Sequence, residues 1–375
     1  MTFDCSRASA RDVDGDGRDD IAVLSDEGVY LLSAGKIVPL PAPEEARHDL
    51  STLVLAHVND DKCADVVVGA PRNDPSPGSV YIYYGGDLRR PTRLDSPQPQ
   101  EGGSFGYALA AYGDLVAIGA PGEAKSRAGA VHLMRGGAIL RTITQDSPGV
   151  PGNSEPLDEF GSALALGPMA GGQVSLAVAA EQERNDGPGR QSRKSEEGEG
   201  AVTVVHDLLS AHLSGARLKV PKIRQPIGSF GEKLVSAPGR GLVASAWGDD
   251  YGQTHLQFFD DELTRGRTVR LPSGTPLDSH DAVAMAPDGR VAFVIEVDPP
   301  FKVKIFSPSG PKNDRAIPLP KNWRRDDGNA LAFSGNRLVL GRYWMNRVIV
   351  MNFDTGAIEF DVSTGIPGFG FAVAG

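Results

Sequence analysis

Apolar residues recur along this chain in short runs of strand length, separated by stretches rich in glycine, proline, asparagine and aspartate. Residues 21–24 (IAVL), 66–68 (VVV) and 115–118 (LVAI) are clear examples. Aliphatic and β-branched runs of this length, bounded by turn residues, predict β-strands and leave little room for long helices. We therefore expect a chain built almost entirely from short strands.

The runs recur in seven groups, each spanning about 40–65 residues, with three clear strands and a weaker fourth. Four antiparallel strands per repeat are typical of a propeller blade. The sequence thus predicts an all-β fold, a seven-bladed β-propeller of four-stranded antiparallel blades in one domain, residues 1–375. The approximate blades are residues 1–48, 49–100, 101–150, 151–225, 226–275, 276–322 and 323–367, with a closing strand at 368–375.

The last residues, 368–375 (GFGFAVAG), restart the pattern of a first strand and then stop. Their natural continuation is the start of blade 1, so we expect the C-terminal strand to close the ring. Closure removes exposed sheet edges, which would otherwise pair with other chains. Residues 3–11 compete for the same place, and the C-terminal segment is favoured because its apolar alternation is better.

The most distinctive loop is residues 12–20 (DVDGDGRDD), directly before the first strand. Carboxylates at alternate positions, followed by a tight turn, can supply several oxygen ligands to one Ca²⁺. The predicted ligands are the side chains of Asp12, Asp14, Asp16 and Asp20 and the backbone carbonyl of Arg18. This is no EF-hand, because position twelve is an apolar residue within a strand. The alternative is a solvated turn, since Asp and Gly favour turns without any metal.

A second, weaker copy of this loop lies at residues 57–65 (HVNDDKCAD). Asn59, Asp61 and Asp65 take the places of Asp14, Asp16 and Asp20. Lys62 stands where the first loop has glycine, and its charge disfavours a bound cation. A hydrogen-bonded turn is therefore the preferred interpretation, with a second metal site as the alternative.

Two short motifs link the repeats to a known family. Phe105-Gly106 begins one repeat, and Gly119-Ala120-Pro121 follows its second strand. This pairing resembles the FG-GAP repeat of integrin α-subunit headpieces and of many bacterial secreted or surface proteins. The resemblance implies a propeller with calcium loops between the first two strands of its blades, like residues 12–20, and a role in adhesion. The motifs weaken in the fifth repeat and are missing from the sixth and seventh.

Composition and charge exclude some classes of partner. The net charge is −10 over 375 residues, which argues against nucleic acid or an anionic membrane as the main partner. No apolar run approaches the roughly 18–20 residues of a transmembrane helix. We therefore expect no membrane span, and we expect a monomer.

The chain has two cysteines, Cys5 and Cys63, which are compatible either with one disulfide or with two free thiols. The first residues, MTFD, do not resemble a signal peptide, since they lack a basic start and an apolar segment. Either the protein stays inside the cell or a leader has been removed. The family resemblance favours a secreted or cell-surface protein.

The loops between the second and third strands of each blade should share one face of the ring, and this face is predicted to bind a ligand. Large rigid aromatic side chains beside acids suit a glycan or a protein hot spot. The alternative is that the rings only fill gaps between neighbouring blades. The candidate residues are Trp247, Asp249, Asp250, Tyr251, Trp323, Tyr343 and Trp344.

Catalytic motifs do not stand out. The seven histidines are scattered, and no nucleophile elbow, phosphate loop or dinucleotide fingerprint is present in the sequence. Adjacent acids such as Asp249-Asp250 or Asp326-Asp327 could serve glycoside hydrolysis, but they are also common in solvated turns. We expect a non-catalytic, calcium-braced module that binds an extracellular protein or a glycan. The alternatives are a propeller enzyme acting on polysaccharide, as a hydrolase or lyase, and a scaffold whose loops bind nothing.

Overall fold

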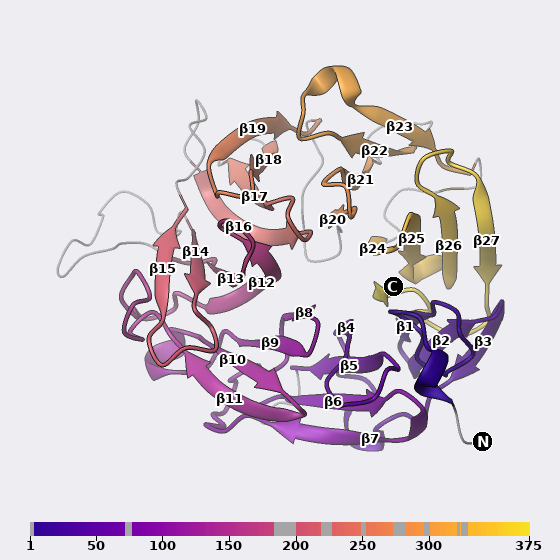
Figure 1. The fold of residues 1–375 in the computed structure, drawn as a ribbon, viewed down its shortest axis with the longest axis horizontal. Coiled ribbons are helices and arrows are strands. Elements are labelled where there is room, and N and C mark those ends of the chain that lie inside the picture. The colour runs from indigo at the N-terminus through magenta and orange to yellow at the C-terminus, as the bar shows by residue number, and fades with distance from the viewer. Residues whose placement is uncertain are drawn as a thin grey trace.

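The computed structural model describes residues 4–71, 77–183, 200–218, 227–248, 253–272, 283–295, 301–320, 323 and 329–375. Its strands form seven four-stranded antiparallel sheets arranged as the blades of a ring (Figure 1). The prediction of a seven-bladed β-propeller is confirmed. None of the helices in the described part of the chain is long and apolar enough to cross a membrane.

The four strands of each blade follow one another from the ring axis outward (Figure 1). Blade 1 has β28 (Val373–Ala374), β1 (Ile21–Ser25), β2 (Gly28–Ser33) and β3 (Lys36–Pro39). Blade 2 has β4 (Thr52–Ala56), β5 (Asp65–Ala70), β6 (Ser79–Tyr84) and β7 (Asp87–Asp95). Blade 3 has β8 (Leu109–Tyr112), β9 (Leu115–Ala120), β10 (Ala130–Arg135) and β11 (Ala138–Ile143). Blade 4 has β12 (Phe160–Met169), β13 (Gln173–Ala180), β14 (Ala201–His206) and β15 (Ser214–Arg217).

The remaining blades follow the same order. Blade 5 has β16 (Ile227–Ser236), β17 (Leu242–Gly248), β18 (Gln253–Phe259) and β19 (Arg265–Arg270). Blade 6 has β20 (Val283–Met285), β21 (Val291–Ile295), β22 (Lys302–Phe306) and β23 (Arg315–Pro318). Blade 7 has β24 (Asn329–Ser334), β25 (Arg337–Arg342), β26 (Arg347–Asn352) and β27 (Ile358–Ser363). The short 3₁₀ helices of the described residues precede or connect strands: η1 (Cys5–Arg7), η2 (Glu44–Ala46), η3 (Lys125–Arg127), η4 (Pro311–Asn313) and η5 (Tyr343–Met345).

The second strand of a blade is buried on both faces, because each sheet packs against a neighbouring sheet on either side. Every residue of β5 and of β9 is buried, whereas the outermost strand β27 alternates between exposed and half-buried positions. This explains why the second strands read as continuous apolar runs and the fourth strands as weak ones. Residues of adjacent blades share one core, as Val67 and Ile82 of blade 2 do with Ile118 of blade 3.

The Phe-Gly motif anchors the start of a blade on the blade before it. Phe105, Phe160, Phe230 and Phe369 are all buried, and the glycine after each has a φ between +92° and +104°. That region favours glycine, because a Cβ would meet the following carbonyl group. In blade 3 the motif precedes the strand: β8 begins at Leu109, later than the sequence pattern indicated.

A glycine near the end of the second strand faces this motif in the next blade. A Cβ on Gly69 would overlap the carbonyl oxygen of Gly106, and a Cβ on Gly119 would overlap that of Gly161. Blade 7 keeps the same contact through Gly341, against Gly370, although the sequence there lacks the full motif. Adjacent blades therefore touch backbone to backbone at these points.

The C-terminal segment closes the ring, as predicted. Val373 and Ala374 of β28 pair antiparallel with Val23 and Ala22 of β1, so blade 1 takes its innermost strand from the end of the chain. Phe369 lies between blades 7 and 1, with its ring centroid 5.7 Å from that of Tyr30. Residues 4–11 do not occupy this position and instead contain η1.

We expect Gly119→Ala to lower the free energy of unfolding by about 1–3 kcal/mol, because the added methyl must push two blades apart. Gly365→Ala is the matched control, since nothing lies within 4 Å of a Cβ at that glycine and its φ is not in the left-handed region. Urea unfolding of the two variants checks this. Equal stability of the two variants would show that the close approach does not limit blade packing.

Candidate metal site and aromatic surface

The loop before β1 brings three of its carboxylates together. One oxygen each from Asp12, Asp14 and Asp20 lies within 4.8 Å of the others. Asp12 and Asp20 are completely buried, and Asp14 is half-buried. Oxygens this close and this well shielded from water repel one another unless a proton or a cation compensates their charge.

Asp12 holds the turn in place. Its Oδ1 accepts hydrogen bonds from the amides of Gly15 at 2.6 Å and Asp16 at 3.2 Å. Its Oδ2 accepts one from the amide of Gly17 at 2.6 Å. Gly15 and Gly17 both have positive φ, which allows the chain to wrap around this carboxylate.

Asp20 has one carboxylate oxygen without a hydrogen-bond partner. Its Oδ2 accepts from the amides of Val13 at 2.8 Å and Asp14 at 3.3 Å, but its buried Oδ1 has no hydrogen-bond partner. Burial is the main reason that the pKa of Asp20 is raised to about 7. Ser33 donates to Oδ2 of Asp14 at 2.8 Å, a supporting contact that the loop sequence alone did not reveal. An orphaned carboxylate oxygen beside two further carboxylates fits a hard cation such as Ca²⁺.

Asp16 is not part of this group of carboxylates. Its side chain is exposed, and its Oδ1 accepts a hydrogen bond from the amide of Arg18 at 2.8 Å. The role of the Arg18 carbonyl as a ligand stays a prediction. The structure thus brings together three of the four predicted carboxylates, and Asp16 serves the turn itself.

The second loop is satisfied by hydrogen bonds. Asp65 is buried like Asp20, but both of its oxygens have partners, the amides of Val58 at 2.7 Å and Gly85 at 2.8 Å. Asn59 and Asp61 bond to each other. Burial raises the pKa of Asp65 to about 6. These contacts favour the hydrogen-bonded turn over a second metal site.

The N-terminal segment ties the two loops together. Cys5 and Cys63 form a disulfide across 58 residues of sequence. His57 Nε2 lies 3.0 Å from the carbonyl oxygen of Ala10, and the amide of Ala64 donates to the carbonyl of Asp12 at 2.8 Å. The disulfide and these hydrogen bonds therefore fix the first loop to the second loop.

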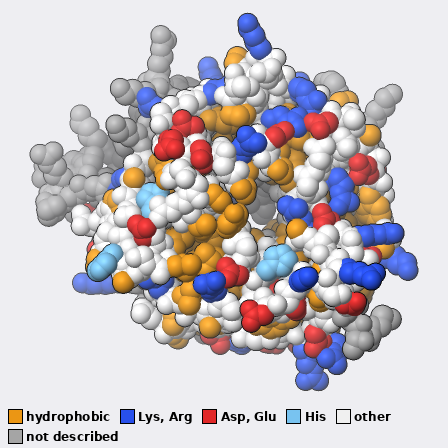
Figure 2. Space-filling view, viewed as in Figure 1, with side chains coloured by type: hydrophobic (Ala, Val, Ile, Leu, Met, Phe, Trp, Pro, Cys, Tyr) orange, Lys and Arg blue, Asp and Glu red, His pale blue; other side chains and the backbone are white. Residues whose placement is uncertain are grey.

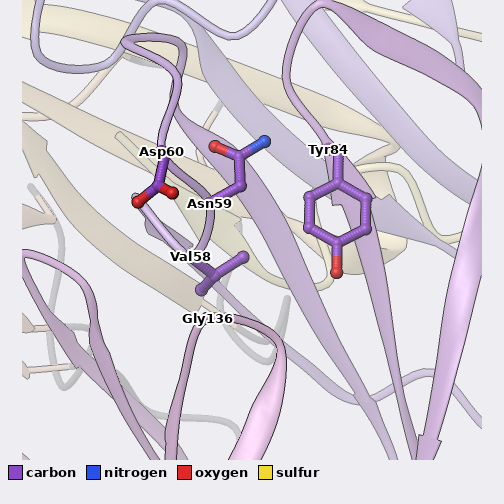
Figure 3. Close-up of a pocket in the computed structure, with 5 residues that line it drawn as sticks. All are labelled: Val58, Asn59, Asp60, Tyr84 and Gly136. Carbon is purple, nitrogen blue, oxygen red and sulfur yellow. The ribbon is translucent and has the colours of Figure 1, made fainter.

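A surface pocket of about 420 Å³ lies beside the second loop. Val58, Asn59, Asp60, Tyr84 and Gly136 line it, and the Asn59 and Tyr84 side chains face the same space (Figure 3). The pocket's lining does not combine an acid, a base and a nucleophile.

Viewed along the ring axis, apolar side chains gather near the centre of the face, and acidic and basic side chains mix around its rim (Figure 2).

The aromatic cluster lies where blade 7 meets blade 1. Trp344, in η5, is 69% exposed. Its ring contacts that of Tyr343 edge-on at 4.8 Å, and Tyr343 in turn contacts Phe371 at 5.6 Å. The Tyr343 hydroxyl donates to Oδ2 of Asp26 at 3.2 Å. We call Tyr343, Trp344 and Phe371 the aromatic surface.

Trp323 does not belong to an exposed face. It is 5% exposed and packs in the core shared by blades 6 and 7, with the guanidinium carbon of buried Arg342 3.5 Å from its ring centre. Its prediction as a ligand contact is corrected, because the ring fills a gap between blades. Asp249, Asp250 and Tyr251 lie outside the described residues, and only the backbone of Trp247 is described, at the end of β17.

Comparisons with known proteins agree with this architecture. No protein-family model matches the chain. Integrin alpha-X of Homo sapiens is 29% identical over 156 residues, 34% of this chain and 13% of that protein. Integrin alpha-X of Mus musculus is 30% identical over 155 residues, 35% of this chain and 13% of that protein. The chain thus aligns with only a small part of these relatives' length.

Among solved structures, apo AztD from Citrobacter koseri has a TM-score of 0.55 at 12% identity, covering 95% of this chain and 97% of that one. A putative 6-phosphogluconolactonase from Bacteroides fragilis has a TM-score of 0.55 at 13% identity, covering 94% and 96%. Likenesses at this identity show the fold alone. The class is therefore the seven-bladed β-propeller. Within it, about a third of the chain resembles integrin alpha-X, and this likeness supports a binding module in general terms.

Without divalent cations, we expect Asp20 to make the fold less stable as the pH rises from about 4 to about 7. The folded state binds the proton of Asp20 more tightly than the unfolded chain does, and this advantage is lost as the pH passes the folded-state pKa. Thermal unfolding in chelator checks it. The fall in melting temperature over this pH range should be smaller in Asp20→Asn than in the unaltered chain. If both depend on pH in the same way, the raised pKa does not belong to Asp20.

Proposed function

We propose that this chain is a non-catalytic, calcium-braced binding module that engages an extracellular protein or a glycan through the aromatic surface. The observation that carries the proposal is the exposure of Trp344, at 69%, on a base of ordered aromatic rings. An exposed tryptophan held by its neighbours loses little conformational freedom on binding. Such residues are typical of protein hot spots and of platforms for sugar rings.

The base of Trp344 is held from both sides of the ring closure. Tyr343 belongs to blade 7, and it contacts Phe371 in the closing segment and Asp26 of blade 1. The amide of Gly368 donates to Oδ1 of Asn346 at 2.8 Å and fixes the same junction. A ligand at this surface would therefore meet a prearranged site, which reduces the entropic cost of binding.

The cation assigned to the first loop is Ca²⁺, held by Asp12, Asp14 and Asp20 with Asp20 Oδ1 as one of its ligands. Its role would be structural, because the loop leads directly into β1, the strand that pairs with the closing strand. A secreted or cell-surface location accords with the disulfide, since oxidising compartments favour such bonds. The integrin likeness supports the same location by analogy.

Calcium should raise the melting temperature of the unaltered chain by more than that of Asp14→Ala, because this variant lacks a ligand of the first loop. At a free concentration of about 100 times Kd, binding to the native state alone adds about 2.7 kcal/mol. Asp61→Ala, at the corresponding loop of blade 2, is the control and should keep the calcium response. Scanning calorimetry in calcium and in chelator measures this, and an equal response in Asp14→Ala and the unaltered chain would remove the metal from the first loop.

The ligand class is tested with a glycan and extracellular-protein array, probed with the purified chain in millimolar calcium and again in chelator. For any hit, Trp344→Ala should weaken binding by about 2 kcal/mol, roughly 30-fold, while the fold is retained. Leu209→Ala is the control, because Leu209 is 57% exposed in the loop between β14 and β15 of blade 4, away from the aromatic surface (Figure 1).

Unchanged affinity in Trp344→Ala would place the binding site elsewhere. A blank array from a folded chain would contradict the binding proposal and favour a scaffold. The polysaccharide-active enzyme remains the alternative, and its candidate acids, Asp249, Asp250, Asp326 and Asp327, all lie outside the described residues. Turnover of an arrayed polysaccharide would support that alternative.

A further inference from the structure

Three carboxylates meet where the chain crosses from blade 3 to blade 4, far from the first loop in sequence. One oxygen each from Glu155, Asp158 and Glu183 lies within 4.8 Å of the others. Asp158 is 1% exposed and Glu183 is 3% exposed. Two of these residues come from the crossing segment and the third from the turn after β13. Their shared position is therefore a product of the fold and not of one local turn.

A buried amide points into the same group. Gln145 is 3% exposed, and its Nε2 donates to Oε2 of Glu183 at 2.6 Å. The other end of this amide, Oε1, is buried and has no hydrogen-bond partner. A buried carbonyl oxygen without a donor is costly. A cation among the carboxylates would give this oxygen a partner, because amide oxygens are ordinary ligands of Ca²⁺.

Among the described residues, Arg217 places a positive charge at the edge of this group, with its Nη2 3.6 Å from Oε2 of Glu183. That separation exceeds the roughly 2.7–2.9 Å of a charge-assisted hydrogen bond. The three carboxylates themselves lie close enough to repel one another, which suits a divalent cation between them.

Blade 3 shows what the same position looks like without such a group. Glu123 corresponds to Glu183: each amide donates to the carbonyl of the residue three before it, and each carbonyl accepts from the glycine that precedes the third strand. Oε2 of Glu123 meets Nε2 of buried His132 at 2.7 Å. Blade 4 has Thr203 in place of this histidine and gains Glu155 and Asp158.

We propose that Glu155, Asp158, Glu183 and the Oε1 of Gln145 form a second calcium site, separate from the first loop. All four proposed ligand atoms are oxygens, as a hard cation requires. The bound ion joins the last turn of blade 3, the crossing segment and the turn after β13, and so fixes blade 4 against blade 3.

The test is calorimetric titration of the full chain, first freed of divalent cations with chelator, with calcium chloride. We expect Asp158→Asn to lose one class of calcium binding, and Gln145→Leu to weaken that class by at least about tenfold, since even outer-shell changes typically cost metal sites about 10- to 100-fold in affinity. Asp14→Ala should keep this class while losing that of the first loop. Glu123→Gln is the matched control and should change neither.

The outcomes separate this site from the first loop. If Asp14→Ala abolishes all calcium binding, or if Asp158→Asn and Gln145→Leu titrate like the unaltered chain, the second site is overturned. Circular dichroism verifies the fold of each variant. If Asp158→Asn does not fold, Gln145→Leu decides, because it removes a neutral side chain and keeps its approximate size.

Discussion

Close contact between the backbones of neighbouring blades is the constraint on which the rest of the ring depends. Gly69 of blade 2 faces the carbonyl of Gly106 of blade 3, and Gly341 of blade 7 faces that of Gly370 in the closing segment. With no side chain between them, the sheets approach closely enough to enclose residues such as Phe105 completely. The Phe-Gly and Gly-Ala-Pro motifs therefore serve the packing of neighbouring blades, and their presence does not by itself indicate a ligand.

The two acidic loops differ by one backbone hydrogen bond to a buried carboxylate. This bond separates a turn whose acceptors are all satisfied from one suited to a metal. Asp20 and Asp65 occupy corresponding positions, and both are buried. The amide of Gly85 reaches the second oxygen of Asp65, whereas the corresponding oxygen of Asp20 has no partner. One backbone donor thus completes one loop and leaves the other with an unmet acceptor.

The blades and the closing strand could be predicted because their signals are local and repeated. The grouping of Asp12, Asp14 and Asp20 could be predicted for the same reason, since one turn supplies all three. The burial of Trp323 could not, because Arg342, whose guanidinium lies over its ring, comes from the end of β25, further along the chain. Nor could the group around Asp158 be anticipated, since its members are spread over residues 145–183 and only the fold of two blades brings them together. The role of Gly341 was missed because a single glycine there replaces the whole motif.

The aromatic surface straddles the junction of the ring. Tyr343 and Trp344 are supplied by blade 7, Phe371 by the closing segment and Asp26 by blade 1, at opposite ends of the chain. A chain still open at this junction has every one of these residues but not their arrangement. Recognition at this surface would therefore depend on closure of the ring. Only a molecule whose first and last blades have paired presents the surface, and a misfolded chain would not bind the ligand.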